Sequence, residues 1–274
     1  MDEDKPIIRL EGVHKAFEGE VVLNGVDLAI QPGRTTVVIG PSGCGKSVLL
    51  KHIVGLLRPD AGKVFFRDHE VSAMSERQLV AVRRRTGFLF QGSALFDSMT
   101  VAQNIIFPMA EHDVGTAAER AERCEEVLSL VGMNGLQDRM PEELSGGQKK
   151  RVALARAIVL DPDVILYDEP TTGLDPIRAD LINELILKLQ ETLGTTAVVV
   201  THDMSSARKV GDRIVMLHEG KFVIDTTPDK LERVDNEVVA RFVEGRASRE
   251  ELAEIETGRL ALNQTRAAER ESSE

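Results

Sequence analysis

The stretch Gly40-Pro-Ser-Gly-Cys-Gly-Lys46-Ser47 decides the fold, because it fits the pattern G-x-x-x-x-G-K-[ST]. The β-branched run Thr35–Ile39 precedes it and indicates a strand buried on both faces. Helical spacing follows over Ser47–Leu57. In such a strand–turn–helix unit, backbone N–H groups and the helix dipole point at phosphate oxygens. The predicted phosphate-binding residues are Gly40, Pro41, Ser42, Gly43, Cys44, Gly45, Lys46, Ser47 and Val48.

Two side chains of this loop have predicted roles. We expect Lys46 to reach the β- and γ-phosphates of a nucleotide and the Ser47 hydroxyl to ligate Mg²⁺. Cys44 lies at a variable position of the pattern and has no predicted redox role.

The segment Val164-Ile-Leu-Tyr-Asp168-Glu169 supplies the second half of this chemistry. Four apolar residues place Asp168 at the carboxyl end of a buried strand, the edge where open α/β sheets bind ligands. We expect Asp168 to hold Mg²⁺ through a water, and Glu169 to act as a base on the attacking water beside the γ-phosphate. Adjacent carboxylates after a strand often mark only its end; the phosphate loop favours the functional interpretation.

The rest of the chain predicts an α/β architecture. Strands separated by helical patterns of 10–15 residues indicate βαβ units around a parallel sheet. Little β signal lies between about 92 and 160, which indicates a helical insertion in that sheet domain. The further strands are expected at Ile7–Val13, Val21–Ile30, Lys63–Phe66, Thr86–Phe90, Thr196–Val200 and Arg213–Leu217, and the further helices at Val101–Pro108, Ala117–Val131, Gly146–Leu160, Ile177–Leu193 and Met204–Val210.

Composition and charge exclude several classes of function. The 274 residues carry 34 Lys+Arg against 45 Asp+Glu, a net charge of −11. This balance argues against a nucleic-acid partner held by phosphate contacts and against adhesion to anionic lipid. Aromatic content of 4% argues against a stacking platform for single strands.

Cysteine usage and apolar runs indicate the compartment. Cys44 and Cys124 form no disulfide framework or zinc spacing, and we expect two reduced thiols in a cytosolic protein. The acidic start MDEDKP predicts no signal peptide, and no apolar run approaches the ~18 residues that span a bilayer. Work at a membrane would therefore need a partner.

A third motif, Leu144-Ser-Gly-Gly-Gln148, precedes a predicted helix and indicates another anion site. Together with the two motifs above, it resembles the signature of ATP-binding-cassette (ABC) ATPases, over residues from about 7 to 244. The resemblance implies a P-loop NTPase (RecA-like) nucleotide-binding domain with an antiparallel β subdomain and a helical insertion. It also implies a domain over 1–244, followed by a C-terminal extension over 245–274.

The same resemblance implies roles for further residues. Phe17 is similar to the aromatic residue that stacks on adenine, although a core or edge-strand Phe stays open. Gln91 resembles the glutamine that contacts Mg²⁺ or the lytic water, and His202 resembles the switch histidine at the γ-phosphate. Asp175 resembles the aspartate of the dimer interface. Ser145, Gly146, Gly147 and Gln148 would close over ATP bound to a second copy, because this chain has one copy of each motif and would work as a head-to-tail pair.

Residues 92–112 resemble the Mla/MCE lipid-transport ATPases, and Ala73-Met74-Ser75 and Val82-Arg-Arg-Arg85 fit the same type. The resemblance implies ATP-driven phospholipid transport between inner and outer membranes, from the cytoplasmic face of the inner membrane. It implies a second copy, a membrane permease and an MCE-domain protein as partners, and in some systems a small accessory subunit. Leu95, Phe96 and Met99 either receive a permease helix or are buried in the insertion.

Several alternatives stay open or are excluded. An importer ATPase for a polar solute such as an amino acid is the alternative within the family. Cassette proteins of DNA or ribosomes usually carry two cassettes or a long coiled coil, which this acidic chain lacks. A small GTPase is excluded because no Asn-Lys-x-Asp motif follows the phosphate loop.

Two further segments keep two interpretations each. Arg83–Arg85 is either a solvated helix end or a phospholipid contact. From Gly245 the composition changes, and Ser248-x-x-Glu251 fits a capping box. This tail is either a frayed end or a short helix that docks on a partner.

Overall fold

The computed structural model describes residues 5–247 and residue 253. The chain divides into two compact units, Met1–Leu231 and Glu232–Glu274. In the second unit, taken by itself, helix α8 (Glu237–Glu244) is capped by the Asn236 side chain and followed by left-handed Gly245. The capping box predicted at 248–251 lies outside the described residues. The boundary predicted at 244, between the ATPase domain and a C-terminal extension, stays a prediction.

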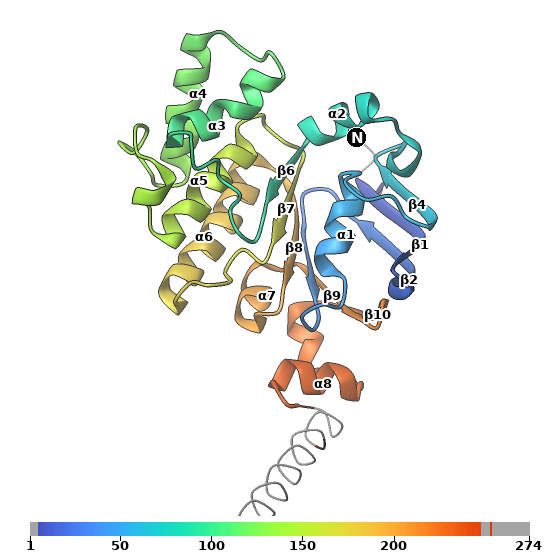
Figure 1. Cartoon of the computed structure of the whole chain (residues 1–274). Helices are drawn as coiled ribbons and strands as arrows, with labels where there is room; N and C mark the ends of the chain where they lie inside the picture. Colours follow the sequence, from blue (N-terminus) through green and yellow to red (C-terminus); the bar gives the residue numbers. More distant parts are fainter. Residues whose placement is uncertain (1–4, 248–252, 254–274) are drawn as a thin grey trace, which may run out of the picture. The chain divides into compact units, whose positions relative to one another are not determined.

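The first unit is built on a six-stranded sheet in the order β10-β9-β3-β8-β7-β6 (Figure 1). Neighbouring strands from β9 to β6 are parallel, and β10 runs antiparallel to β9. Every residue of β3, β7 and β8 is buried, as their continuous apolar and β-branched sequences predict. The strands are β3 (Thr35–Ile39), β6 (Thr86–Leu89), β7 (Val164–Asp168), β8 (Thr196–Thr201), β9 (Arg213–His218) and β10 (Lys221–Thr226).

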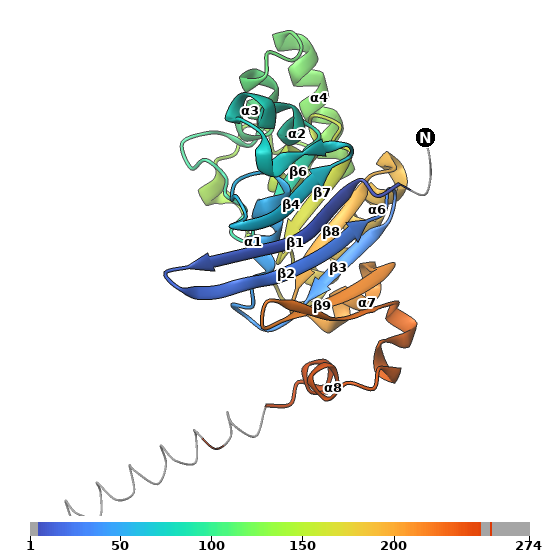
Figure 2. The same ribbon diagram turned by 90° about the vertical axis from the view of Figure 1, so that its right-hand side faces the viewer.

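A second, antiparallel sheet has the order β2-β1-β4-β5, and Figure 2 shows its long β1–β2 hairpin with β4 beside β1. Helix α1 (Lys46–Ile53) lies between the two sheets (Figure 1). Its side chains Leu49, Leu50 and Ile53 have no exposed surface, so the phosphate-loop helix is fixed by core packing. The strands are β1 (Ile8–Phe17), β2 (Glu20–Ile30), β4 (Ala61–Phe66) and β5 (His69–Glu70).

The expected helical insertion separates β6 from β7 in the sequence. Helices α3 (Val101–Glu111) and α4 (Ala117–Leu130) lie away from the sheet, and α5 (Gly146–Ile158) packs beside β6 (Figure 1). The predicted α/β class with an antiparallel sheet and helical insertion is thus confirmed. The remaining helices are α2 (Glu76–Arg84), α6 (Pro176–Leu193), α7 (Met204–Val210) and the 3-10 turns η1 (Val71–Ala73), η2 (Pro141–Glu143) and η3 (Pro228–Arg233). Within residues 5–247 and at residue 253, each helix is too short or too polar to span a bilayer.

Helix α1 ends four residues earlier than predicted. Gly55 adopts a left-handed φ of 66°, and the Leu56 N–H bonds the Lys51 carbonyl, as in a Schellman motif. The Arg83 guanidinium then donates to the Val54 and Gly55 carbonyls at 3.2 and 3.1 Å. Arg83 therefore caps the end of α1, whereas Arg84 and Arg85 are exposed, as expected for a solvated helix end. The alternative, a phospholipid contact by this run, stays a prediction.

Asn104 holds the loop that joins β6 to α3. Its side chain has no exposed surface; Nδ2 donates to the carbonyls of Phe96, Met99 and Thr100, and Oδ1 accepts from the Phe96 N–H at 2.8 Å. One buried amide therefore satisfies four backbone groups, and this fixes where Phe96 lies.

Asn104→Ala should lower the free energy of unfolding by about 2–3 kcal/mol, because the Phe96 N–H and the Met99 carbonyl lose the partner that the buried amide gives them. Urea denaturation measures this change. The control is Gln103→Ala in the same turn, which removes one exposed capping bond and should cost about 0.5–1 kcal/mol. Equal losses in the two variants would contradict the structural role of Asn104.

Candidate functional site

A pocket of about 260 Å³ lies where the loops after β3, β6, β7 and β8 meet, at the carboxyl ends of four parallel strands. Open α/β sheets bind ligands at this edge. Nine predicted site residues line the pocket: Ser42, Gly43, Gly45, Lys46, Ser47, Val48, Gln91, Glu169 and His202. The fold therefore brings together residues from four separate stretches of sequence.

Two glycines of the phosphate loop are required by geometry. Gly40 and Gly45 adopt φ values of 151° and 102°. A Cβ on Gly40 would lie 2.2 Å from the Leu217 carbonyl oxygen, and one on Gly45 would lie 2.8 Å from the Val22 Cγ1. Any side chain at Gly40 would therefore displace the neighbouring strand, and the backbone can approach a ligand only because glycine stands there.

Lys46 begins α1 and is 6% exposed. Its Nζ donates to the Gly40 and Pro41 carbonyls at 2.8 and 2.9 Å, and lies 3.7 Å from Glu169 Oε1. The loop thus holds a buried ammonium group against its own backbone carbonyls. A cation enclosed by glycine-rich backbone suits a polyanion such as a nucleotide triphosphate.

Ser47 and Asp168 meet across the site, 121 positions apart in sequence. The Ser47 hydroxyl donates to Asp168 Oδ1 at 2.7 Å. Burial raises the pKa of the Asp168 carboxyl, and the Ser47 hydrogen bond opposes that rise. A hydroxyl and a buried carboxylate oxygen in contact, with the Glu169 carboxylate next in sequence, form a hard-oxygen donor set that fits Mg²⁺.

Glu169 is held in a strained conformation. Its φ of 49° is left-handed, which is costly for a side chain with a Cβ, and its N–H donates to the Val200 carbonyl at 2.9 Å. Oε2 accepts from Thr172 Oγ1 at 3.1 Å and lies 2.9 Å from His202 Nδ1. The carboxylate therefore has one oxygen toward Lys46 and the other toward His202.

Thr172 is a site residue that sequence reasoning missed. Its hydroxyl contacts the same carboxylate oxygen as His202. Its position three residues after Glu169 is the only signal in the sequence, and a threonine in a turn carries no chemistry of its own.

Phe17 ends β1 outside the residues that line this pocket, with 42% of its surface exposed. The Lys15 Nζ lies 5.3 Å above its ring. Asp60 accepts from the Lys15 ammonium at 2.6 Å and from the Ala16 N–H at 2.7 Å. A residue more than 40 positions along the chain therefore fixes the end of β1 beside Phe17. The exposed ring rules out a core role for Phe17.

The signature segment lies outside the pocket of its own chain. Ser145 caps α5, and Gly146 and Gly147 neighbour Leu174 and Arg178. Asp175 caps the adjacent α6 and contacts Arg178 at 3.2 Å, and Gln148 completes the capping box with Ser145. The residues predicted to act in trans thus lie together at the start of α5, next to the start of α6, and none of them lines the pocket.

Residues 23–172 match the family model described as "ABC transporter". The chain belongs to the ABC transporter family. It is 38% identical over 225 residues to the intermembrane phospholipid transport system ATP-binding protein MlaF of Haemophilus influenzae, covering 82% of this chain and 85% of MlaF. It is 39% identical over 239 residues to the probable ribonucleotide transport ATP-binding protein mkl of Mycobacterium tuberculosis, covering 87% of this chain and 67% of mkl.

One of the similar solved structures contains bound nucleotide. A dimeric ATP-binding cassette in a post-hydrolysis state, with ADP and phosphate bound, is 34% identical to this chain, with a TM-score of 0.74. The alignment covers 81% of this chain and 98% of that structure's chain. The present chain is therefore an ATP-binding cassette and an ATPase, as its three motifs predicted.

Cys44 offers a probe of the phosphate loop that depends on pH. Burial raises the pKa of its thiol, and the nearby Lys46 ammonium only partly opposes the rise. A raised pKa means less thiolate at a given pH, so alkylation by iodoacetamide at pH 7 to 8 should be slower than for free cysteine. The rate should still be rising above pH about 8.5, and ATP should protect the thiol.

Mass spectrometry of the labelled peptide measures this rate, with Cys44→Ser as the control that removes the signal. Cys124, whose pKa is raised to about 11 by burial, should react only after denaturation. A labelling rate for Cys44 that levels off below pH 8 would show an activated thiolate and contradict the expectation.

Proposed function

We propose that this ABC ATPase drives phospholipid transport between the inner and outer membranes of a bacterium, bound to a permease at the cytoplasmic face of the inner membrane. The 38% identity to MlaF, over 85% of that relative, supports this substrate class. Residues 92–112, which resemble the Mla/MCE type, agree with it. The name of mkl points to ribonucleotides, and a polar-solute importer remains the competing function. In the proposed complex an MCE-domain protein, and in some systems a small accessory subunit, complete the transporter.

The pocket residues divide the proposed chemistry between them. Lys46 and the loop N–H groups bind the β- and γ-phosphates, and Ser47, Asp168 and Gln91 hold Mg²⁺. When bound, Mg²⁺ neutralises charge on the phosphate oxygens. Glu169 polarises the attacking water, because its carboxylate lies between Lys46 and His202 at the pocket wall.

Three further residues complete the proposed nucleotide site. His202, whose Nδ1 lies 2.9 Å from Glu169 Oε2, keeps the Glu169 carboxylate oriented and contacts the γ-phosphate. The exposed Phe17 ring stacks on adenine, and Lys15 above the ring restricts its position. Asp175 joins the interface with the second copy.

A second copy completes the site in this proposal. The helix N-terminus at Ser145–Gln148 would serve as an anion site that lies outside its own pocket, beside Arg178 and its ion-pair partner Asp175. A head-to-tail pair places this segment of one chain over the pocket of the other and buries ATP between them. The dimeric state named for the solved cassette with ADP and phosphate supports this arrangement.

Glu169→Gln should slow steady-state ATP hydrolysis by about a hundredfold or more, because the amide still accepts a hydrogen bond but cannot take a proton. With ATP and Mg²⁺, this variant should accumulate as a dimer, which size-exclusion chromatography with light scattering measures. Lys46→Ala is the matched control: it should bind ATP poorly and stay monomeric. A wild-type rate in Glu169→Gln would defeat the assignment of the base.

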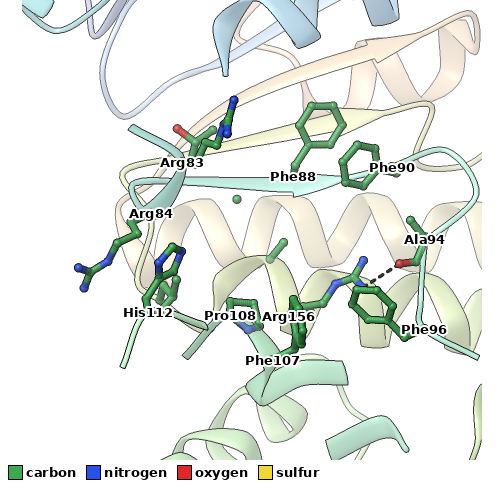
Figure 3. Close-up of a pocket in the computed structure, with 14 residues that line it drawn as sticks. Arg83, Arg84, Phe88, Phe90, Ala94, Phe96, Phe107, Pro108, His112 and Arg156 are labelled. Carbon is green, nitrogen blue, oxygen red and sulfur yellow. Dashed lines mark hydrogen bonds between the residues drawn. The ribbon is translucent and has the colours of Figure 1, made fainter. Parts of the chain in front are cut away.

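An aromatic groove provides the proposed permease site. A hollow of about 470 Å³ lies between β6, α2, α3 and α5, and Figure 3 shows its aromatic and basic side chains. Phe88 and Phe90 stack at 4.1 Å between ring centroids, and Phe96 packs on Phe107 at 4.8 Å. Leu95 and Met99, which the sequence grouped with Phe96, are half-buried and do not line the groove.

The groove suits one helix of a membrane subunit. Its aromatic floor would bury an apolar side chain, and its basic residues Arg84, His112 and Arg156 would favour an acidic one. Phe96 and the 92–112 segment, where family members differ, form one wall. This surface therefore accounts for how an ATPase without a membrane-spanning helix in its described part would act at a membrane.

The complex isolated through a tag on this chain should transfer fluorescent phospholipid between vesicles when ATP is added. Phe96→Asp should abolish transfer and reduce the amount of permease that co-purifies, because it puts a carboxylate in the aromatic groove. Arg233→Gln, a charge change in the η3 turn, is the control and should transfer normally. ATP-dependent uptake of a labelled ribonucleotide or amino acid, without lipid transfer, would favour the competing function.

A further inference from the structure

Lys150 is a buried cation to which the proposed chemistry assigns no role. It lies on α5, and 4% of its surface is exposed. Its Nζ donates to the Gln91 carbonyl at 3.0 Å and to the Glu169 carbonyl at 3.3 Å. Burial lowers the pKa of the ammonium, while the carboxylates of Glu169 and Asp168 favour its charged form. Lysine is seldom buried this completely unless its ammonium has partners.

The two carbonyls that Lys150 contacts end different strands. Gln91 follows β6 and Glu169 follows β7, whereas Lys150 comes from the helical insertion, four residues inside a helix that begins at the signature segment. One ammonium therefore ties the insertion to both loops of the pocket. A shift of α5 relative to β7 would change these two contacts directly.

The contact to Glu169 stabilises a costly backbone conformation. A left-handed φ is costly for a residue other than glycine, and Glu169 has φ 49°. Its N–H donates to the Val200 carbonyl, and its own carbonyl accepts from the Thr172 N–H within the turn and from the Lys150 ammonium, each at 3.3 Å. Lys150 is thus the contact that reaches this turn from α5. This turn directs the Glu169 side chain toward Lys46 and His202.

The loop after Gln91 is held from the same helix. Ser93 and Ala94 also adopt left-handed φ values of 65° and 48°. Arg156 of α5 donates to their carbonyls at 2.9 and 2.8 Å, and Figure 3 shows the bond to Ala94. Arg156 and Ala94 line the aromatic groove, so α5 holds one end of this loop at the groove and the other end at the pocket.

We propose that Lys150 is a positioning residue for hydrolysis, which fixes the backbone of Glu169 and so makes the rate depend on where α5 lies. The inference rests on the proposed role of Glu169. Lys150 touches neither nucleotide nor water in this account; it acts through the Glu169 turn. A purely structural lysine would stabilise the fold without a specific effect on turnover.

The test compares kcat, the KM for ATP and thermal stability in purified full-length variants. Lys150→Met keeps the length of the side chain and removes the donors; its kcat should fall about tenfold or more, with KM changed less than about twofold. Lys150→Arg, which keeps donors and charge, should recover part of kcat. Lys221→Met removes an exposed lysine from β10 and should match the wild type.

A double variant separates positioning from structure. If Lys150 acts through Glu169, adding Lys150→Met to Glu169→Gln should slow hydrolysis no further, whereas independent effects would multiply. If Lys150→Met does not fold, Lys150→Gln takes its place, because its shorter amide cannot reach both carbonyls.

The outcomes distinguish this inference from the proposed function. A wild-type kcat in Lys150→Met or Lys150→Gln, beside a slow Glu169→Gln, overturns the positioning role alone. Losses that multiply in the double variant overturn it as well. A wild-type rate in Glu169→Gln overturns the proposed base and, with it, the inference built on that base.

Discussion

The contact between Ser47 and Asp168 is the constraint on which the site depends. It joins the first residues of α1 to the last residue of β7 through one hydrogen bond of 2.7 Å. The sheet makes this contact possible, because β8 pairs with both β3 and β7 and aligns Ile39 with Thr201 and Asp168 with Val200. Loops that leave these strands must then meet at one edge. The helical insertion can separate the two halves in sequence without separating them in space.

A protein of net charge −11 concentrates a few buried charges at this edge. Asp168, Glu169, Lys46 and Lys150 are each less than a tenth exposed. Burial is costly for each charge, and mutual contacts and backbone partners offset that cost. The surface charge therefore says little about the site, because the fold sets the local balance of two carboxylates and two ammonium groups. Because these four charges cancel, a bound polyanion would interact with the ammonium groups and a divalent cation with the carboxylates.

Much of the fold and of the site could be predicted from the sequence, because the motifs that define them are local. The phosphate loop and the strand before Asp168 are local patterns, in which residue type and spacing alone determine the backbone. Strand β5, of two residues, and β10, on the edge, carry too little periodicity to be found. The end of α1 was misplaced because the apolar pattern continues past Ile53, and Gly55 with the distant Arg83 stops the helix.

The roles of Thr172, Asn104 and Lys150 could not be predicted, since they depend on contacts between segments far apart or on the geometry of a turn.

The central claim is that the loop over Gly40–Ser47 and the end of β7 form one nucleotide site. A crystal structure of the Glu169→Gln variant with ATP and Mg²⁺ tests it most directly. We expect the triphosphate along the loop with Lys46 on its terminal phosphates, Mg²⁺ on the Ser47 hydroxyl beside Asp168, and Ser145 of a second copy at the γ-phosphate. A triphosphate bound elsewhere, or a metal away from Ser47 and Asp168, would contradict it.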